Sequence, residues 1–281
     1  MCQPTFLCIP FFPFFFSELS DVLVSCTYVY MTLTVLLVRH GETVDNIRQI
    51  YAGTRDSECA ALLPSKANPL CTRLTVHGMA QAKALADSLK HEPVSHIFCS
   101  DLKRASRTAA AIAEHHSQIV AIPDQLFREQ DFGELEGQCW RETWTADAAS
   151  RARAIASFGE SNVALAERAS LAWDWVLRQV SPMHEHQFVV IISHGRLLRS
   201  LLTSICRYYD TPRPPNVYWG NASYVRLSVI SGRAPVLVFD RVNESGHLTS
   251  LQRQKGGVGS STFDESQKTI DLFFSPSPEK K

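Results

Sequence analysis

The sequence predicts an α/β protein, a three-layer αβα sandwich with a mainly parallel central sheet. Short apolar runs rich in valine, isoleucine and leucine alternate with longer helical patterns over most of the chain. Such alternation is typical of parallel strands whose crossover connections are helices. With 281 residues, 45% of them hydrophobic, the chain has enough material for a sizeable core.

The expected elements follow one another in a regular order. A buried strand over Val35–Val38 leads into a turn and a short helix that ends at Gly53. The later segments are listed by residue number: helix 74–90, strand 96–101, alanine-rich helix 102–116, strand 119–123, loop 127–137, helix 160–180, strand 188–195, helix 196–209, and two closing strands at 224–230 and 235–242. The short Ser-Gly link between the last two predicts that they are antiparallel neighbours.

Two terminal segments differ from this central part in composition. Residues 1–30 are apolar, but they contain three prolines and lack the basic start of a signal peptide. We expect them to be an extension of doubtful structure, a weak signal or membrane anchor being the alternative, and the folded domain to span 31–242. Residues 243–281 are rich in Ser, Gly, Gln and Lys, which is typical of a flexible tail.

Charge and cysteine content exclude several classes of function. The 28 basic and 28 acidic residues balance, which argues against direct nucleic-acid binding. The eight cysteines are scattered singly and form no Cys-x-x-Cys pair, so we expect reduced thiols and a cytoplasmic or nuclear protein. No cluster of metal-ligating residues stands out, and we expect no metal, no cofactor and no membrane partner.

Two predicted strands share the same ending. "TVLLVRHG" places His40 after one apolar run, and "FVVIISHG" places His194 after another. A single histidine at a strand end is more often structural than functional. Because parallel strands end at the same edge of a sheet, the two imidazoles are expected to meet there, where α/β proteins bind ligands.

Phosphoryl transfer is a chemistry that such a pair can perform. A neutral imidazole is a good nucleophile near pH 7. The transferred group needs cations around its oxygens, for which Arg39 and Arg104 are candidates. A leaving oxygen needs a general acid. The segment "REQDFGELEG" supplies four carboxylates for that role: Glu129, Asp131, Glu134 and Glu136.

Four motifs in order resemble those of the histidine phosphatase superfamily, also called phosphoglycerate mutase-like. Arg39-His40-Gly41-Glu42-Thr43, with Asn46 behind it, resembles the first motif, and "SDLKRASRTA" resembles the second. "REQDFGELEG" resembles the third and "SHG" the fourth, while "LTVHGMAQA" matches the helix after the first motif. The resemblance covers residues 33 to about 240 and implies that family's fold.

The resemblance also implies a role for each matching residue. His40 is the nucleophile that becomes phosphohistidine, and Glu129 protonates the leaving alcohol before water releases phosphate. The residues implied to bind the substrate are Arg39, Asn46, Arg104, His194 and Gly195. The other three carboxylates of the third motif and Arg107, close to Arg104, are expected to be surface or flanking charges.

The chain departs from the family pattern between Gly53 and Leu74. An insertion at about 58–73, "ECAALLPSKANPLCTR", lies beside the expected substrate mouth and is either a lid or a segment wrongly kept in the gene model. The residues after Gly137 lack the expected pattern of a mutase. The implied activity is therefore metal-independent hydrolysis of a small phosphomonoester, with a phosphoglycerate mutase-type phosphotransferase as the alternative.

The tail contains a second recognisable pattern in "SQKTIDLFFSP". Gln267, Ile270, Phe273 and Phe274 resemble the PIP box, by which proteins dock on the replication sliding clamp. One helical turn would place the three apolar residues on a single face. A final helix that packs on the protein's own core is one alternative. A clamp-binding protein with weak or lost catalysis is another.

Overall fold

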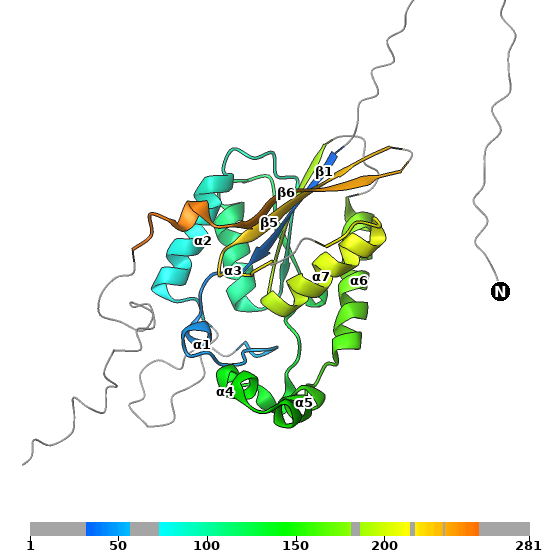
Figure 1. Ribbon diagram of the computed structural model, residues 1–281. Helices are drawn as coiled ribbons and strands as arrows, with labels where there is room; N and C mark the ends of the chain where they lie inside the picture. The colour runs from blue at the N-terminus through cyan, green and yellow to red at the C-terminus, as the bar shows by residue number, and fades with distance from the viewer. Residues whose placement is uncertain (1–31, 57–72, 181–185, 214–216, 233, 253–281) are drawn as a thin grey trace, which may run out of the picture.

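The computed structural model describes residues 32–56, 73–180, 186–213, 217–232 and 234–252 (Figure 1). The extension 1–30, nearly all of the insertion at about 58–73 and the docking motif 267–274 lie outside these residues. Within the described residues no helix is long and apolar enough to cross a membrane.

A six-stranded sheet forms the centre of the fold. In the order of the sheet the strands are β3 (Ala121–Asp124), β2 (His96–Ser100), β4 (Gln187–Ser193), β1 (Thr32–Arg39), β5 (Tyr224–Ile230) and β6 (Val236–Glu244). The first four are parallel, whereas β5 is antiparallel to both β1 and β6. The prediction of a mainly parallel sheet with two antiparallel closing strands is confirmed.

Helices cover both faces of the sheet (Figure 1). On one face lie α2 (Val76–Leu89) and α3 (Lys103–Ala113), and on the other α6 (Asn162–Gln179) and α7 (Gly195–Tyr208). β1 contributes side chains to the hydrophobic core on both faces of the sheet, because successive side chains of a strand point to opposite faces. Leu36 packs with the α2 and α3 residues, while Val35 and Leu37 pack with α6 and α7.

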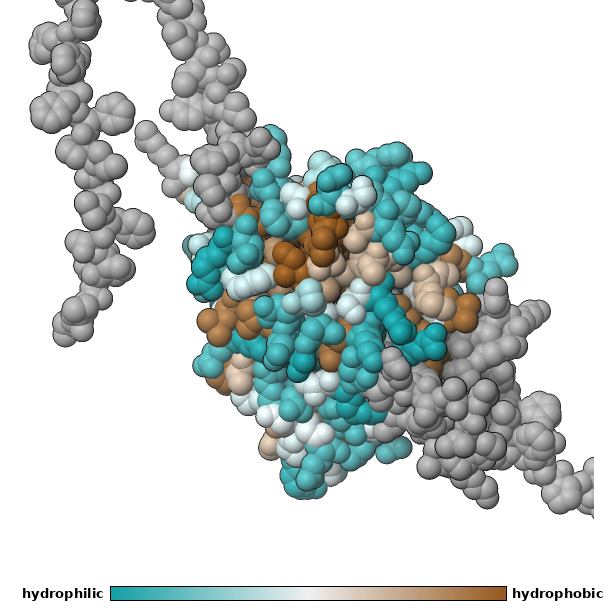
Figure 2. Space-filling model, turned by 180° about the vertical axis from the view of Figure 1, so that it is seen from behind, coloured by the Kyte–Doolittle hydropathy of each residue, from teal (hydrophilic) through white to brown (hydrophobic). Residues whose placement is uncertain are grey.

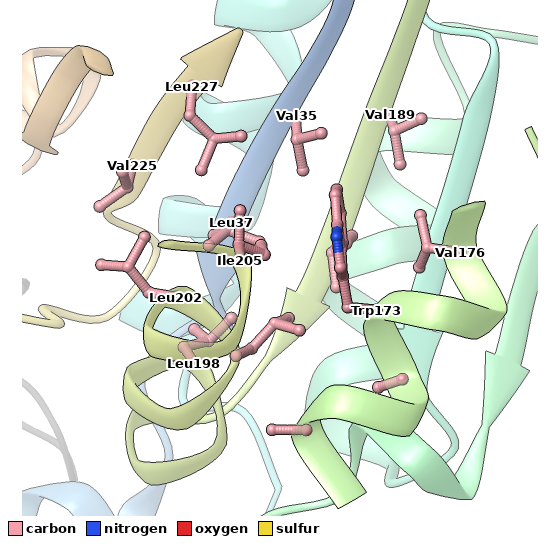
Figure 3. Close-up of a cluster of buried hydrophobic side chains, with 14 of the residues drawn as sticks. Val35, Leu37, Trp173, Val176, Val189, Leu198, Leu202, Ile205, Val225 and Leu227 are labelled. Carbon is pink, nitrogen blue, oxygen red and sulfur yellow. The ribbon is translucent and has the colours of Figure 1, made fainter. Parts of the chain in front are cut away.

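The core on the α6–α7 side is the larger of the two. Figure 3 shows Trp173 of α6 and Leu202 of α7 against the strand residues Leu37 and Val189. Trp173 is only 1% exposed. Truncating a tryptophan so deeply buried costs roughly 3–5 kcal/mol of stability, so this layer contributes strongly to the stability of the fold.

Three short helices lie at the carboxyl end of the parallel strands: α1 (Val44–Ile47), α4 (Trp140–Thr145) and α5 (Ala148–Ala156) (Figure 1). The sequence predicted a first helix reaching Gly53, but α1 ends earlier. It did not indicate α4 or α5. None of the residues of α5 is buried, so no apolar periodicity marks that helix.

The domain boundary expected at residue 242 is wrong. β6 continues to Glu244, and a 3₁₀ turn, η3 (Gly246–Leu248), follows it. The ring of His247 stacks on Tyr224 with 5.8 Å between centroids, and its Nε2 lies 2.9 Å from the carbonyl oxygen of Ala222. These contacts come from one histidine in a polar segment, which composition alone does not reveal.

Large hydrophobic side chains are exposed at scattered positions. Val120 is 82% exposed and Tyr218 72%. On the face seen in Figure 2, hydrophobic residues are interrupted by hydrophilic ones. Isolated exposed hydrophobic residues are normal on folded proteins and do not by themselves mark a binding surface.

Candidate active site

The two histidines lie side by side at the carboxyl edge of the sheet. β1 and β4 are adjacent and parallel, with Arg39 paired in register with Ser193. His40 and His194 follow directly, and their ring centroids are 5.0 Å apart with 59° between the planes. The residues are 3% and 1% exposed. The structure therefore brings together the two histidines that the sequence singled out.

The His40 ring is held by its own backbone neighbourhood. Nδ1 lies 2.7 Å from the carbonyl oxygen of Gly41, and because a carbonyl only accepts, Nδ1 carries the proton. Burial, followed by Arg104 and Arg39, holds the pKa of His40 well below its usual value. The ring is thus neutral at pH 7, and its Nε2 has a free lone pair.

The loop after His40 is fixed by two glycines that allow backbones to touch. A Cβ on Gly41 would lie 2.5 Å from the carbonyl oxygen of Gly78, near the start of α2. One on Gly78 would lie 2.1 Å from the carbonyl oxygen of Glu42. A larger residue at either position would push this loop away from α2. The two glycines therefore allow the loop after His40 to pack directly on α2.

His194 is protonated on the opposite side of its ring. Arg104 Nε donates to His194 Nδ1 at 3.2 Å, so that nitrogen carries no proton. Burial, followed by Arg104 and His40, holds the pKa of His194 well below its usual value. The single proton of the neutral ring therefore lies on Nε2. This buried Nε2–H has no hydrogen-bond partner among the described residues.

Arg104 enters from the start of α3 and is 1% exposed. Its Nη1 donates to the carbonyl oxygen of Arg55 at 2.9 Å, and its Nη2 donates to that of Gly53 at 2.6 Å. Burial lowers the pKa of Arg104 to about 10, so it is a cation at neutral pH. Each terminal nitrogen carries a second proton, which remains for an anion in the site.

Arg39 approaches the same space from the end of β1. Its Nη1 donates to the carbonyl oxygen of Trp219 at 2.6 Å, while its buried Nε has no hydrogen-bond partner in the described chain. Gly195 opens α7 beside it, where an added Cβ would come no closer than 4.0 Å to Arg39 Nε. The positive start of α7 therefore lies beside this buried donor.

Glu129 lies in the loop after η1 (Gln125–Phe127) and is anchored on the start of α7. Its Oε1 accepts from the backbone N–H groups of Gln130 at 2.9 Å and Leu197 at 3.2 Å. Its Oε2 accepts a longer bond, 3.3 Å, from the N–H of Arg196. The carboxyl group is therefore fixed, and Oε2 is the oxygen with the longer hydrogen bond.

Asn46 is oriented by a network that the sequence did not indicate. Its Oδ1 accepts from the Thr43 backbone N–H at 3.1 Å and from Asn221 Nδ2 at 2.9 Å. Asn221 also donates to the carbonyl oxygen of His40. Because the amide oxygen is occupied, the Nδ2 of Asn46 is the group available to a ligand. Asn221 and Trp219 come from a loop far along the chain, and no spacing pattern marks them.

The remaining charges of the motifs have structural or surface positions. Asp131 accepts from the N–H of Gly133 at 2.7 Å. Glu136 accepts from the Thr54 N–H at 2.8 Å. Glu134 and Arg107 are exposed. None of the four lines the cavity that contains His40.

The two histidines line a cavity of about 470 Å³. Every residue implied by the resemblance to act on the substrate lines it, and so do Tyr51, Trp140, Arg199 and Trp219. A larger cavity of about 780 Å³ lies on the other side of Glu129, but neither His40 nor Arg104 lines it. Chemistry at the histidines therefore belongs to the smaller cavity, and Glu129 forms part of the wall of both.

Comparison with known proteins assigns the class. The family model of the histidine phosphatase superfamily (branch 1) matches residues 35–241. A probable phosphatase of Schizosaccharomyces pombe is 34% identical over 246 residues, which cover 86% of this chain and 80% of the relative. The chain therefore belongs to the histidine phosphatase superfamily, and it is a hydrolase of the phosphatase kind.

Other similar proteins carry more specific names. A metal-independent phosphoserine phosphatase of Arabidopsis thaliana is 28% identical, over 77% of this chain and 84% of its own. The solved structure of a mycobacterial glucosyl-3-phosphoglycerate phosphatase is 26% identical with a TM-score of 0.58. The similarity covers 75% of this chain and 99% of the chain in the solved structure. In the part of this chain that the structure describes, no group of three or more His, Cys, Asp or Glu residues could hold a metal ion.

Proposed function

We propose that this phosphatase hydrolyses small phosphomonoesters through a phosphohistidine on Nε2 of His40. The observation that carries the proposal is the opposite kind of hydrogen-bond partner at Nδ1 of two neighbouring rings, a carbonyl oxygen for His40 and a guanidinium N–H for His194. His40 presents a lone pair, whereas His194 presents an N–H, and the ring centroids are 5.0 Å apart. One ring is suited to attack phosphorus, and the other to bind a phosphoryl oxygen.

The first half-reaction forms a nitrogen–phosphorus bond. The lone pair of His40 Nε2 attacks phosphorus in line with the ester oxygen, and the P–O bond breaks. Glu129 Oε2 gives its proton to the leaving oxygen, which departs as the alcohol. In the second half-reaction Glu129 takes a proton from water, the resulting hydroxide attacks phosphorus, and the P–N bond returns its electrons to His40.

Fixed donors surround the position of the phosphoryl group. His194 Nε2–H and Arg39 Nε–H have no partner among the described residues, and both are buried. Arg104 and the Asn46 amide add further N–H groups. Donors that are already oriented stabilise the developing charge without reorganisation during the reaction. The start of α7 at Gly195 adds the partial positive charge of the helix.

The enzyme is tested with para-nitrophenyl phosphate, phosphoserine and 3-phosphoglycerate. We expect free phosphate from the first at least, with the same rate in EDTA, because no step uses a metal. Isomerisation of phosphoglycerate without net phosphate release would show the mutase activity for which other relatives are named. Strong inhibition by EDTA, reversed by a divalent ion, would contradict the histidine mechanism.

We further propose that the tail docks on a replication sliding clamp. Gln267, Ile270, Phe273 and Phe274 match a short docking pattern, with "GGVGSS" as a tether before it and Ser-Pro-Ser-Pro after it. This motif lies outside the described residues, so the support is the sequence pattern alone. Two neighbouring phenylalanines in a mostly polar segment favour a partner that covers them.

A peptide covering 262–281 is expected to bind the clamp at micromolar strength or better. Replacing Phe273 and Phe274 with alanine in the full chain should abolish binding and leave phosphatase activity unchanged. A wild-type peptide that does not bind would exclude docking. Unfolding of the doubly substituted chain would show instead that the tail packs on its own domain.

A further inference from the structure

A basic groove continues from the mouth of the catalytic cavity. It lies between α6 and α7, has a volume of about 240 Å³ and is lined by Arg196, Arg199, Arg207 and Arg213. Arg196 and Arg199 also line the catalytic cavity, so the two spaces share a wall. None of the described residues that line the groove is acidic.

The arginines of α7 lie along one face of the helix. Arg196, Arg199 and Arg207 are separated by three and eight residues, close to whole turns of an α-helix. The opposite face, which includes Leu198 and Leu202, is buried in the core. At 1.5 Å per residue, Arg207 lies roughly 16 Å along the helix from Arg196. The groove is thus an extended track that leads away from the histidines.

The arginines of this track differ in how they are held. Arg196 donates from Nε to Gln130 and from Nη2 to Asn162. The side chains of Arg199, Arg207 and Arg213 form no hydrogen bond or ion pair with any residue that the structure describes. Burial lowers the pKa of Arg196. The negative charge of Glu129 raises this pKa, and the nearby cation of Arg199 lowers it. Arg199, Arg207 and Arg213 are exposed, so their guanidinium groups are accessible to an anion that lies along the groove.

We propose that this groove binds the anionic continuation of the substrate, and that the ligand it fits is a linear chain of phosphates whose terminal group reaches His40. Guanidinium groups bind phosphate oxygens with paired donors. The catalytic rings are 3% and 1% exposed, so a slender chain reaches them more readily than the backbone of a phosphoprotein. The inference rests on the proposed function and adds a substrate class to it.

Such a ligand would react by the same two steps as a phosphate ester. His40 Nε2 attacks the terminal phosphorus, and the bond to the bridging oxygen breaks. The shortened chain leaves on that oxygen, protonated by Glu129, and water then releases orthophosphate from His40. Arg207 and Arg213, which do not line the catalytic cavity, bind the leaving chain rather than the transferred group. They should therefore affect affinity for long anions and not the hydrolysis of a small ester.

The test measures how orthophosphate, pyrophosphate, tripolyphosphate and a longer linear polyphosphate inhibit hydrolysis of para-nitrophenyl phosphate. For the wild-type enzyme the inhibition constant should fall at least tenfold along this series. Arg207→Gln with Arg213→Gln should weaken binding of the longest chain about tenfold, with kcat/KM for para-nitrophenyl phosphate unchanged. The matched control is Arg178→Gln with Arg241→Gln, which removes the same charge from exposed positions that do not line the groove.

Inhibition that does not depend on chain length would overturn the proposal. An equal loss of affinity for the longest polyphosphate in the control variant would also overturn it, since that loss would show a general effect of net charge. Calorimetric binding of tripolyphosphate to the wild-type protein needs no turnover. If the wild-type protein binds tripolyphosphate and the groove variant does not, the groove proposal is supported even if the phosphatase mechanism fails. If the enzyme hydrolyses the ester but inhibition does not depend on chain length, the phosphatase mechanism is supported and the groove proposal is not.

Discussion

The ends of β1 and β4 have nearly the same local sequence but different chemistry. Each strand is a buried aliphatic run followed by a polar residue, a histidine and a glycine. At the end of β1, His40 Nδ1 donates to the carbonyl oxygen of the next residue. At the end of β4, His194 Nδ1 accepts from Arg104. The same motif thus yields a lone pair on Nε2 in one place and an N–H in the other.

In the mechanism that we propose, the partner of Nδ1 assigns the role of each ring. A carbonyl oxygen can only accept and a guanidinium can only donate, so the two contacts place the proton on opposite nitrogens. Burial and the nearby arginines keep both rings neutral. One histidine can therefore act as the nucleophile while its neighbour stabilises charge. The following predictions test this division of labour, from the largest expected effect to the smallest.

Replacing His40 with alanine should abolish turnover, by roughly 10⁴-fold or more, because no other group in the cavity replaces the nucleophile. The measurements are the rate of phosphate release and alkaline-quench trapping of phosphohistidine. His91→Ala, at an exposed position, serves as the control and should behave like wild type. A His40→Ala variant with near wild-type activity would rule out covalent catalysis at this residue.

The effect of Glu129→Gln on kcat should depend strongly on the leaving group. An alkyl phosphate needs a proton on the departing oxygen, so its hydrolysis should slow by about 10²–10⁴-fold, whereas an activated aryl phosphate should lose much less. The comparison of kcat for the two substrates is the readout. Glu134→Gln, at an exposed carboxylate, should affect neither. Equal losses on both substrates would indicate that Glu129 binds or positions rather than donates.

His194→Ala should slow the reaction by roughly 10²–10³-fold, the usual effect of removing one donor to a developing oxyanion. Unlike His40→Ala, this variant should still accumulate phosphohistidine, only more slowly. The readout is single-turnover formation of the covalent intermediate. Complete loss of the intermediate would mean that the two strand ends do not divide the roles as described.

The same buried rings should also make stability depend on pH. Each folded pKa lies below the ordinary value near 6.5, so the unfolded chain binds more protons as pH falls below 6.5. Unfolding free energy should therefore decrease as the pH falls below 6.5. Urea unfolding of wild type and His194→Gln measures it. An unchanged pH slope in the variant would show that His194 is not held neutral.

Much of this site could be predicted from the sequence because strand ends follow simple rules. An apolar run that stops at Arg39-His40 or Ser193-His194 places those residues at one edge of a parallel sheet. The four motifs then indicated Arg104 and Glu129, and the structure places both in the cavity of His40. Asp131 and Glu136, which lie in the same segment, bond to backbone N–H groups instead.

What the sequence could not show depends on contacts between distant segments. Trp219 and Asn221 fix Arg39 and Asn46 from a loop about 180 residues away, and neither belongs to a motif. The tautomer of each histidine is set by one neighbouring atom rather than by residue type. α5 was missed because none of its residues is fully buried and only Ile155 packs on a hydrophobic cluster. The end of the domain was placed too early because His247 packs from within a polar segment.

The central claim is the opposite protonation of the two rings, and nitrogen NMR tests it most directly. Long-range proton–nitrogen correlation on histidine-labelled protein at pH 7, assigned with the two alanine variants, gives the tautomer of each ring. We predict a neutral His40 protonated on Nδ1 and a neutral His194 protonated on Nε2. A His40 protonated on Nε2, or on both nitrogens, would leave no nucleophilic lone pair facing the cavity and would contradict the account.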